Sequence, residues 1–314
     1  MFKLSLKLVR ATHNGVVLAQ RGLRTYTRYV YYSLRDRKGR QNGPYSSHGA
    51  DDIEERYSLN HTSYEDFLLS QWSNSAYHYA MYRTLVAVYF TFMVFYAAVY
   101  GVLGWKMLIM LTYWSFYILT ACQIIRAANC WHYIQLKKDG KDPKVMLQNS
   151  KRIKFQWLLH NLSCNAAPIV SILFWTLAYD GSGVNLINIT THGVNAVFVI
   201  MDTFITRTPV RLIHLYHSTL YGLLYGLFSV IYWQFGGTNH KNEPFIYKVL
   251  DFSLSLKIAF SYIFTIAFIV APMIHCMFFF LYRFRLFIHR YLKVAERRDK
   301  KCTSTYEIQN KETS

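Results

Sequence analysis

Residues 84–105 read TLVAVYFTFMVFYAAVYGVLGW and contain no charged side chain. As an α-helix, a run of this length is long enough to cross the roughly 30 Å hydrocarbon core of a bilayer. Backbone amide and carbonyl groups find no partner in lipid, so a segment that crosses the bilayer must satisfy them internally. The run therefore predicts a transmembrane helix.

Five further apolar runs follow in the same chain. Together they predict six transmembrane helices at about 84–105, 107–125, 155–179, 191–206, 212–235 and 258–282. A tight turn at Lys106 separates the first two, and the fourth is short. With 53% hydrophobic and 18% aromatic residues, the composition is too apolar for most soluble domains. We therefore predict an all-α fold, a polytopic membrane helical bundle.

Lysine and arginine mark one side of the membrane. The segment before the first helix has 12 of them through Arg83, the loop 131–154 has 7, and the tail from Arg283 has 9. The opposite loops have Lys106 in the first turn, none in 180–190, and Lys241, Lys248 and Lys257 between the fifth and sixth helices. Because short cytoplasmic loops are enriched in lysine and arginine, both termini are predicted to be cytoplasmic.

The chain divides by composition into three regions. Residues 1–80 are expected to form a basic and polar cytoplasmic region that is partly disordered, 81–282 the transmembrane domain, and 283–314 a basic cytoplasmic tail. The first 35 residues lack acidic side chains, which also resembles a mitochondrial transit peptide, although a cytoplasmic basic arm explains the pattern equally well.

The formal charge of +18 indicates the kind of partner to expect. Because the basic residues flank apolar runs, we expect the lipid bilayer and the anionic lipids of the cytoplasmic leaflet as partners, and no nucleic acid. The five cysteines form no CxxC pair and indicate neither a disulfide framework nor a zinc site. Gly222 and Gly226 could seat a neighbouring helix or a second copy of the chain.

The chain contains the short motifs SQW at 70–72, LTYW at 111–114, THGVNAVFVIMD at 191–202 and IYWQFGG at 231–237. Together these motifs resemble the rolling stone family of multi-pass membrane proteins. The resemblance implies a plasma-membrane protein that acts in cell–cell fusion of the myoblast type or in adhesion, with no established chemistry. Residence in the endoplasmic reticulum is the alternative. On this hypothesis we expect no enzyme activity and no cofactor.

A more distant resemblance is to the androgen-induced family of intramembrane lipid hydrolases. It implies a threonine nucleophile at Thr112, and it aligns His192 and Asn195 with two histidines of that family. The position of the catalytic histidine is Asn195 here, and an amide cannot act as a general base. His192 could replace it, so the alternative function is a lipid ester hydrolase with Thr112, His192 and Asn195 as site residues.

Ionisable residues also gather near the inner ends of four predicted helices. His160, His217, His275 and Asp202 lie at similar depths, about 8–12 Å from the inner interface. Facing histidines could ligate haem, and a histidine and aspartate group could hold a metal ion. The alternative is a structural polar core, because histidines often join membrane helices by hydrogen bonds. We expect Asp202 to pair with a histidine rather than with Arg207.

Overall fold

Helices dominate the described part of the chain. The computed structural model describes residues 58–179, 181 and 183–312, which belong to a compact unit running from Glu55 to Ser314. The expectations for residues 1–57 and 313–314 fall outside the described residues.

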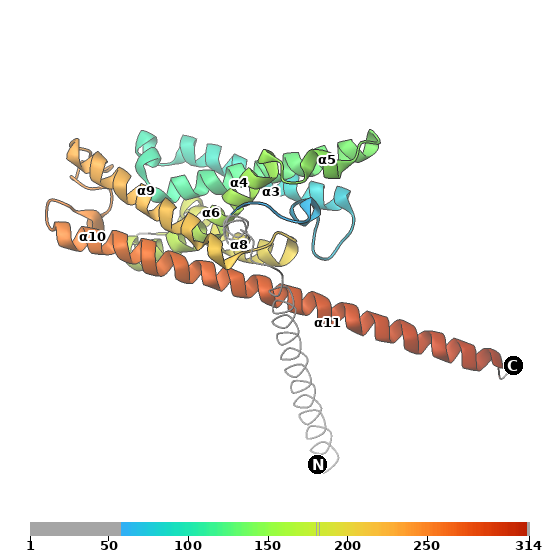
Figure 1. Ribbon diagram of the computed structural model, residues 1–314. Coiled ribbons are helices and arrows are strands. Elements are labelled where there is room, and N and C mark those ends of the chain that lie inside the picture. The colour runs from blue at the N-terminus through green and yellow to red at the C-terminus, as the bar shows by residue number, and fades with distance from the viewer. Residues whose placement is uncertain (1–57, 180, 182, 313–314) are drawn as a thin grey trace, which may run out of the picture. The chain divides into compact units, whose positions relative to one another are not determined.

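The described residues form six helical rods joined by loops (Figure 1). The rods are α3 (Ala76–Tyr100); α4 (Leu111–Lys138); α6 (Lys151–Leu173) with the π-helical turn η3 (Phe174–Ala178); α7 (Leu186–Ile189) with η4 (Thr190–Val194) and α8 (Asn195–Ile205); η5 (Leu212–His214) with α9 (Leu215–Gln234); and α10 (Leu256–Thr265) with η7 (Ile266–Val270) and α11 (Ala271–Glu312). The connections contain η1 (Tyr64–Phe67), η2 (Gly104–Ile109), α5 (Pro143–Leu147) and η6 (Lys248–Leu250).

The predicted fold class is confirmed, since the protein is an all-α membrane bundle. Three rods are long and apolar enough to cross a membrane on length and composition alone: Ala76–Tyr100, Lys151–Ala178 and Leu256–Glu296. The other three rods carry more polar side chains or are shorter, so the bundle must shield their polar groups. Figure 1 places the start of α3 and the end of α11 at the same end of the bundle, as six passes require.

Helix boundaries differ from the predicted ones because hydropathy marks the lipid-facing part of a rod rather than its ends. The first rod starts at Ala76, where the Ser75 side chain caps it by accepting a hydrogen bond from the backbone N–H of His78. It ends at Tyr100, and the turn expected at Lys106 is the 3-10 helix η2. The helix predicted to end at residue 125 continues to Lys138.

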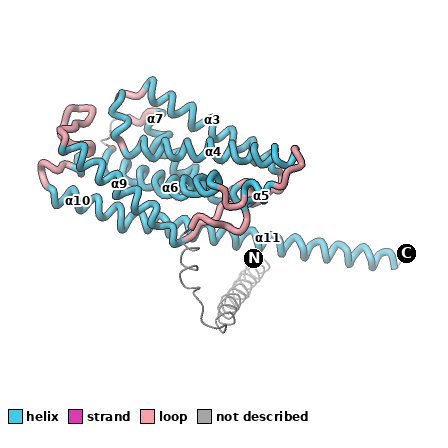
Figure 2. The backbone as a smooth tube through the Cα atoms, turned by 45° about the horizontal axis from the view of Figure 1, so that its top comes forward, coloured by secondary structure: helices cyan, strands magenta, loops and turns pink. Residues whose placement is uncertain are grey.

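The third rod is the centre of the bundle. Helix α6 contacts α4, α8, α9 and α11, while α3 packs against α4 on one side (Figures 1 and 2). Most of α6 is buried, including polar residues such as Gln156, Asn161 and Asn165. The helix with the least lipid contact can therefore carry the polar groups that bind its neighbours.

The glycines of α9 seat a helix of the same chain. A Cβ atom at Gly226 would lie 2.6 Å from the Ile263 side chain of α10, and one at Gly222 would lie 3.4 Å from the Ala267 side chain of η7. Small residues let two membrane helices approach closely. The sequence allows two partners for these glycines, a neighbouring helix or a second copy of the chain. Within the described residues, the partner is a neighbouring helix of the same chain.

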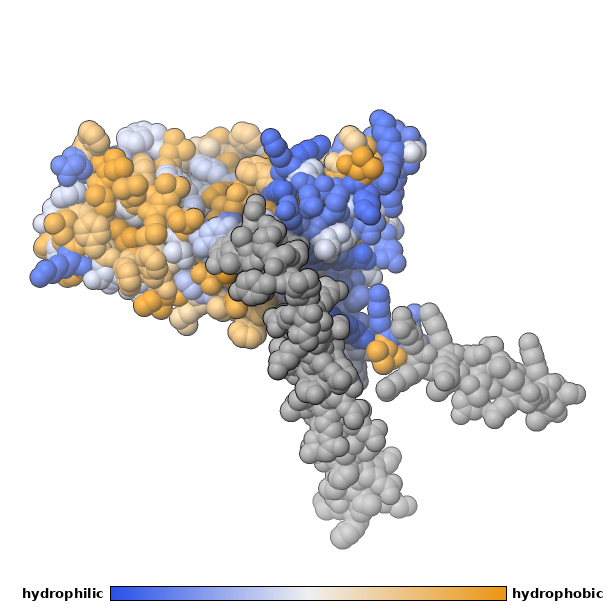
Figure 3. Space-filling model, in the orientation of Figure 1, coloured by the Kyte–Doolittle hydropathy of each residue, from blue (hydrophilic) through white to orange (hydrophobic). Residues whose placement is uncertain are grey.

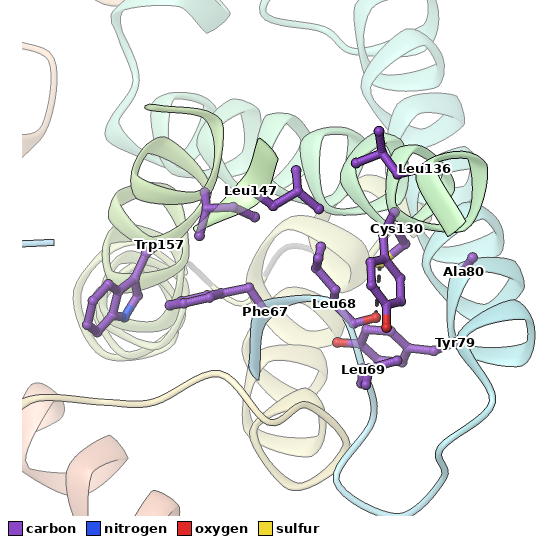
Figure 4. Packing of buried hydrophobic residues seen from close by; sticks show 11 residues of the cluster. Phe67, Leu68, Leu69, Tyr79, Ala80, Cys130, Leu136, Leu147 and Trp157 are labelled. Carbon is purple, nitrogen blue, oxygen red and sulfur yellow. Dashed lines mark hydrogen bonds between the residues drawn. The ribbon is translucent and has the colours of Figure 1, made fainter. Parts of the chain in front are cut away.

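An apolar cluster closes the inner end of the bundle. Phe67 and Leu68, from the segment before α3, pack among Cys130 of α4, Leu147 of α5 and Trp157 of α6 (Figure 4). The Cys130 thiol lies 3.7 Å from the Leu68 carbonyl oxygen. The packed unit thus begins before residue 80, and the part of the N-terminal region from about residue 58 onward belongs to it.

The surface has two chemically different parts. Figure 3 shows an apolar surface over most of the bundle and a hydrophilic surface at the end where α3 begins and α4 ends. The basic residues of the loop between α4 and α6 lie in this hydrophilic end, and Lys137, Lys138, Lys141 and Lys144 are exposed. The polarity of the surface therefore agrees with the predicted cytoplasmic side.

Candidate functional site

Three arginines are fully buried between the helices. Arg83 on α3, Arg126 on α4 and Arg285 on α11 each have 0% of their surface exposed. An unpaired charge in such a place is very costly, so each guanidinium must find partners within the protein.

Asp202, near the end of α8, is the partner of two of them. Arg83 Nη1 lies 2.7 Å from Asp202 Oδ1, and Arg126 Nη1 lies 2.8 Å from Oδ2. The Tyr82 hydroxyl also donates to Oδ1, at 3.1 Å. Two guanidinium groups at these distances stabilise the ionised carboxylate. The expected pairing of Asp202 with a histidine is wrong, because arginines from α3 and α4 occupy both of its oxygens.

The Nη atoms of these arginines bind further partners, whereas Arg83 Nε and Arg126 Nε have no hydrogen-bond partner among the described residues. Arg126 Nη2 donates to Thr206 Oγ1 at 2.7 Å, and Arg83 Nη2 donates to the Tyr79 hydroxyl at 2.5 Å. Arg126 Nη1 lies 3.4 Å from His160 Nδ1. A guanidinium has no acceptor, so Nδ1 of His160 accepts in this contact and the ring proton is on Nε2.

Arg285 binds backbone rather than a carboxylate. Its Nη1 donates to the carbonyl oxygens of Thr203, at 2.8 Å, and Thr206, while Nη2 donates to those of Arg207 and Thr208, both at 3.2 Å. The last carbonyls of a helix lack intrahelical partners and carry partial negative charge. Arg285 therefore caps the end of α8 with its positive charge.

The segment from Thr206 to Arg211 is non-helical, and most of it is buried. Besides Arg285, its carbonyls accept from Trp157 Nε1 at Pro209 and from His275 Nε2 at Arg211, both at 2.9 Å. Non-helical backbone at membrane depth is tolerated where the protein satisfies its polar groups. We define the polar junction as Arg83, Arg126, Asp202, Thr206, Thr208 and Arg285.

The segment before α3 closes the junction from the hydrophilic end. The Gln71 backbone N–H donates to the Ile205 carbonyl at 2.8 Å, and Ser70 pairs with Thr206 in an isolated antiparallel bridge. Arg207 Nε donates to the Ser70 carbonyl at 2.6 Å. The junction thus joins α3, α4, α8 and α11 and the segment that precedes α3.

The four residues predicted for a metal or haem site do not form one group. His160 and Asp202 lie at the polar junction, both beside Arg126. His217 Nδ1 lies 3.5 Å from Asn161 Nδ2, and His275 Nδ1 lies 3.1 Å from Asn165 Nδ2. Among the described residues, no three His, Cys, Asp or Glu side chains are grouped to hold a metal ion. The histidines instead join α9 and α11 to the asparagines of α6.

The three residues of the hydrolase hypothesis lie in separate surroundings. Thr112 on α4 lies beside the Tyr247 hydroxyl, whereas the His192 ring stacks on Phe174 with centroids 3.6 Å apart. Asn195 donates to the Thr191 carbonyl at 2.5 Å and accepts from the Ala196 N–H at 2.7 Å. Within the described chain, no hydrogen bond, ion pair or ring contact joins Thr112 to His192.

Sequence reasoning missed the three buried arginines. Arg83 was assigned to the cytoplasmic flank, Arg126 lay one residue beyond a predicted helix, and Arg285 was counted in the basic tail. One signal was present in the sequence, because a lone Asp202 within an apolar run requires a cationic partner.

These features define a polytopic α-helical membrane protein whose inner half is joined by a buried ionic junction. The family model described as Protein rolling stone matches residues 52–299, and the chain therefore belongs to the rolling stone family. The Drosophila melanogaster protein named Protein rolling stone is 26% identical over 202 residues, which cover 60% of this chain and 72% of that protein. No solved structure matches the chain.

Proposed function

We propose that this protein is a multi-pass plasma-membrane protein that acts in cell–cell fusion or adhesion without catalysis. Membership of the rolling stone family supports the biological setting. The observation that supports a non-catalytic role is the pairing of the buried Asp202 with two arginines. Both oxygens of Asp202 are bound by arginines, so Asp202 is not available as a general base.

The separation of the outer polar residues also supports a non-catalytic role. A threonine hydroxyl is a weak nucleophile and needs a base within about 3 Å. The ring of His192 faces Phe174 instead, and its carbonyl accepts hydrogen bonds from Ser171 and Trp175. Thr112 lies beside the Tyr247 hydroxyl, which has no role as a general base for it in the hydrolase hypothesis.

The outer cap, which we define as η2 and the loop between α9 and α10, is the part of the protein best placed to meet partners in the same membrane. Lys106, between α3 and α4, donates to Thr238 Oγ1 in the loop after α9 at 3.0 Å and to the Tyr232 hydroxyl at the end of α9 at 3.2 Å. The same loop exposes Phe235 (88%) and Leu254 (82%). A fixed loop with exposed apolar side chains fits a lateral protein partner or the outer lipid interface.

The hydrophilic inner end favours a second, electrostatic contact. The exposed Lys137, Lys138, Lys141 and Lys144 lie at this end. Anionic lipids of the cytoplasmic leaflet attract each basic residue near the membrane surface with a free energy of about 1 kcal/mol. The proposed partners are therefore the bilayer, its anionic inner lipids, and other membrane proteins.

The test is a content-mixing assay between fusing cells that express the protein. Deletion is expected to lower the fraction of fused cells, and expression of the intact chain to restore it. Thr112→Val removes the hydroxyl at constant size and is expected to restore fusion equally well, with the protein at the cell surface by biotinylation.

Two outcomes would contradict this proposal. Normal fusion in deleted cells would remove the fusion role, and retention of the protein in the endoplasmic reticulum would remove the plasma-membrane assignment. If Thr112→Val reaches the surface but fails to restore fusion, the hydroxyl is required and the lipid hydrolase becomes the better hypothesis.

A further inference from the structure

The outward face of α11 carries one continuous apolar seam. Large side chains recur along it at alternating intervals of four and three residues, and all are exposed or half-buried. They are Met273, Met277, Phe280, Phe284, Phe287, Tyr291 and Val294, which we call the α11 seam. A repeat of seven residues with two apolar positions is the pattern by which α-helices pair in coiled coils.

The seam is distinct from the face that binds the bundle. His275, Phe278 and Arg285 point inward, with 1%, 1% and 0% exposure, while Phe280 and Phe287 are 68% and 58% exposed. Met277 also packs against a core cluster of the bundle, but the other six seam residues belong to none of the core clusters of the described residues, so something outside these residues must cover them.

Lipid covers only the first half of the seam. Arg285 is bound at the end of α8, and the His289 ring contacts Trp72, which precedes the start of α3. From Arg285 to Val294 the helix rises about 13 Å further. Phe287, Tyr291 and Val294 thus lie close to or beyond the level of Trp72. Three exposed apolar side chains beyond the lipid tails mark an interaction surface.

We propose that α11 pairs in parallel with α11 of a second copy of this chain in the same membrane. Two copies in one membrane have the same orientation, so a two-fold axis along the membrane normal brings each seam residue opposite its own equivalent. The seam residues of the two copies then lie opposite one another along the whole seam, both within the bilayer and beyond it. This pairing is independent of the proposed role in fusion.

The area of the seam suits a stable pair. A large side chain buries about 150–250 Å² when fully covered, and six of the seven are about half to two-thirds exposed, while Met277 is more buried. Complete cover would bury about 700 Å² on each copy, close to the ~800 Å² per partner of standard interfaces.

The charges beside the seam do not oppose the pairing. In a parallel pair, the residue just before every second seam residue, such as Arg283 before Phe284, faces the residue five positions later in the partner helix. Arg283 would face Ile288 and Arg290 would face Ala295, so no two cations meet.

Disulfide trapping in the full-length protein in its native membranes tests this proposal. In a chain carrying Cys276→Ser and Cys302→Ser, Phe287→Cys places a thiol on the seam, and Glu296→Cys places one on an exposed position of the other face. Copper phenanthroline with oxygen oxidises two facing thiols to a disulfide. Phe287→Cys is expected to yield at least tenfold more covalent dimer than Glu296→Cys at equal expression.

A nitroxide-lipid experiment separates pairing from adsorption of α11 to the membrane surface. With a fluorophore on Phe287→Cys, pairing predicts weak quenching by headgroup-labelled lipid. Equal dimer yields from the two cysteines would overturn the proposal. Strong quenching without a covalent dimer would also overturn it and would place the seam on the lipid surface instead.

Discussion

Asp202→Asn is expected to lower the free energy of unfolding by about 3–5 kcal/mol. The amide has nearly the same size as the carboxylate, but it leaves Arg83 and Arg126 buried without a counter-charge. One of its two terminal atoms also becomes a donor that faces an arginine donor. Thermal unfolding of the purified protein in detergent measures the loss, which for a chain of this size amounts to roughly 10 °C in Tm.

The matched control is the same substitution in an exposed ion pair. Asp139 lies 3.6 Å from Lys141, and both side chains are open to solvent. Because exposed pairs contribute about 0–1 kcal/mol, Asp139→Asn is expected to change Tm little. If both variants unfold at the temperature of the unchanged protein, the buried ion pairs do not stabilise this fold.

Arg285→Lys is expected to open the segment 206–211. A lysine ammonium has three donors at one point and cannot reproduce the planar guanidinium that reaches four carbonyls. Each buried carbonyl left without a donor costs about 1–3 kcal/mol. Faster tryptic cleavage after Arg207 and Arg211, followed by mass spectrometry, measures the opening, and Arg285→Leu is expected to have a larger effect.

Arg283→Leu serves as the control for this result. Arg283 lies two residues away on the same helix and is exposed. Its substitution is expected to leave the cleavage rate within about twofold, because no carbonyl of the segment depends on it. Equal protection of the segment in the Arg285 variants would show that other contacts hold it in place.

Apolar runs predicted the fold because most rods contain a long run of consecutive uncharged residues. They did not predict helix ends, since α4 and α11 continue into water as helices with polar sequences. The part of the N-terminal region that packs at Phe67 and Leu68 was also unexpected. Its contacts are with Leu147 and Trp157, far along the chain, and no local pattern records them.

Residue spacing could group the polar residues by their position along the helices, but it could not predict their partners. Residue spacing placed His217, His275 and Asp202 near the inner interface, because the rise per residue of a helix is fixed. The rotation of each helix about its axis determines which side chains meet, and this depends on packing. Asn161 and Asn165, four residues apart on one face of α6, were the visible sign that this helix holds the histidines.

Our main conclusion is that the polar junction holds α4 and α8 together through the ion pair between Arg126 and Asp202. A double-mutant cycle on Arg126→Met and Asp202→Asn, followed by unfolding in detergent, tests it most directly. We predict that the double variant is more stable than the sum of the single losses implies, with a coupling energy of about 1–3 kcal/mol. Additive losses would contradict the account, since they would mean that the two side chains do not interact.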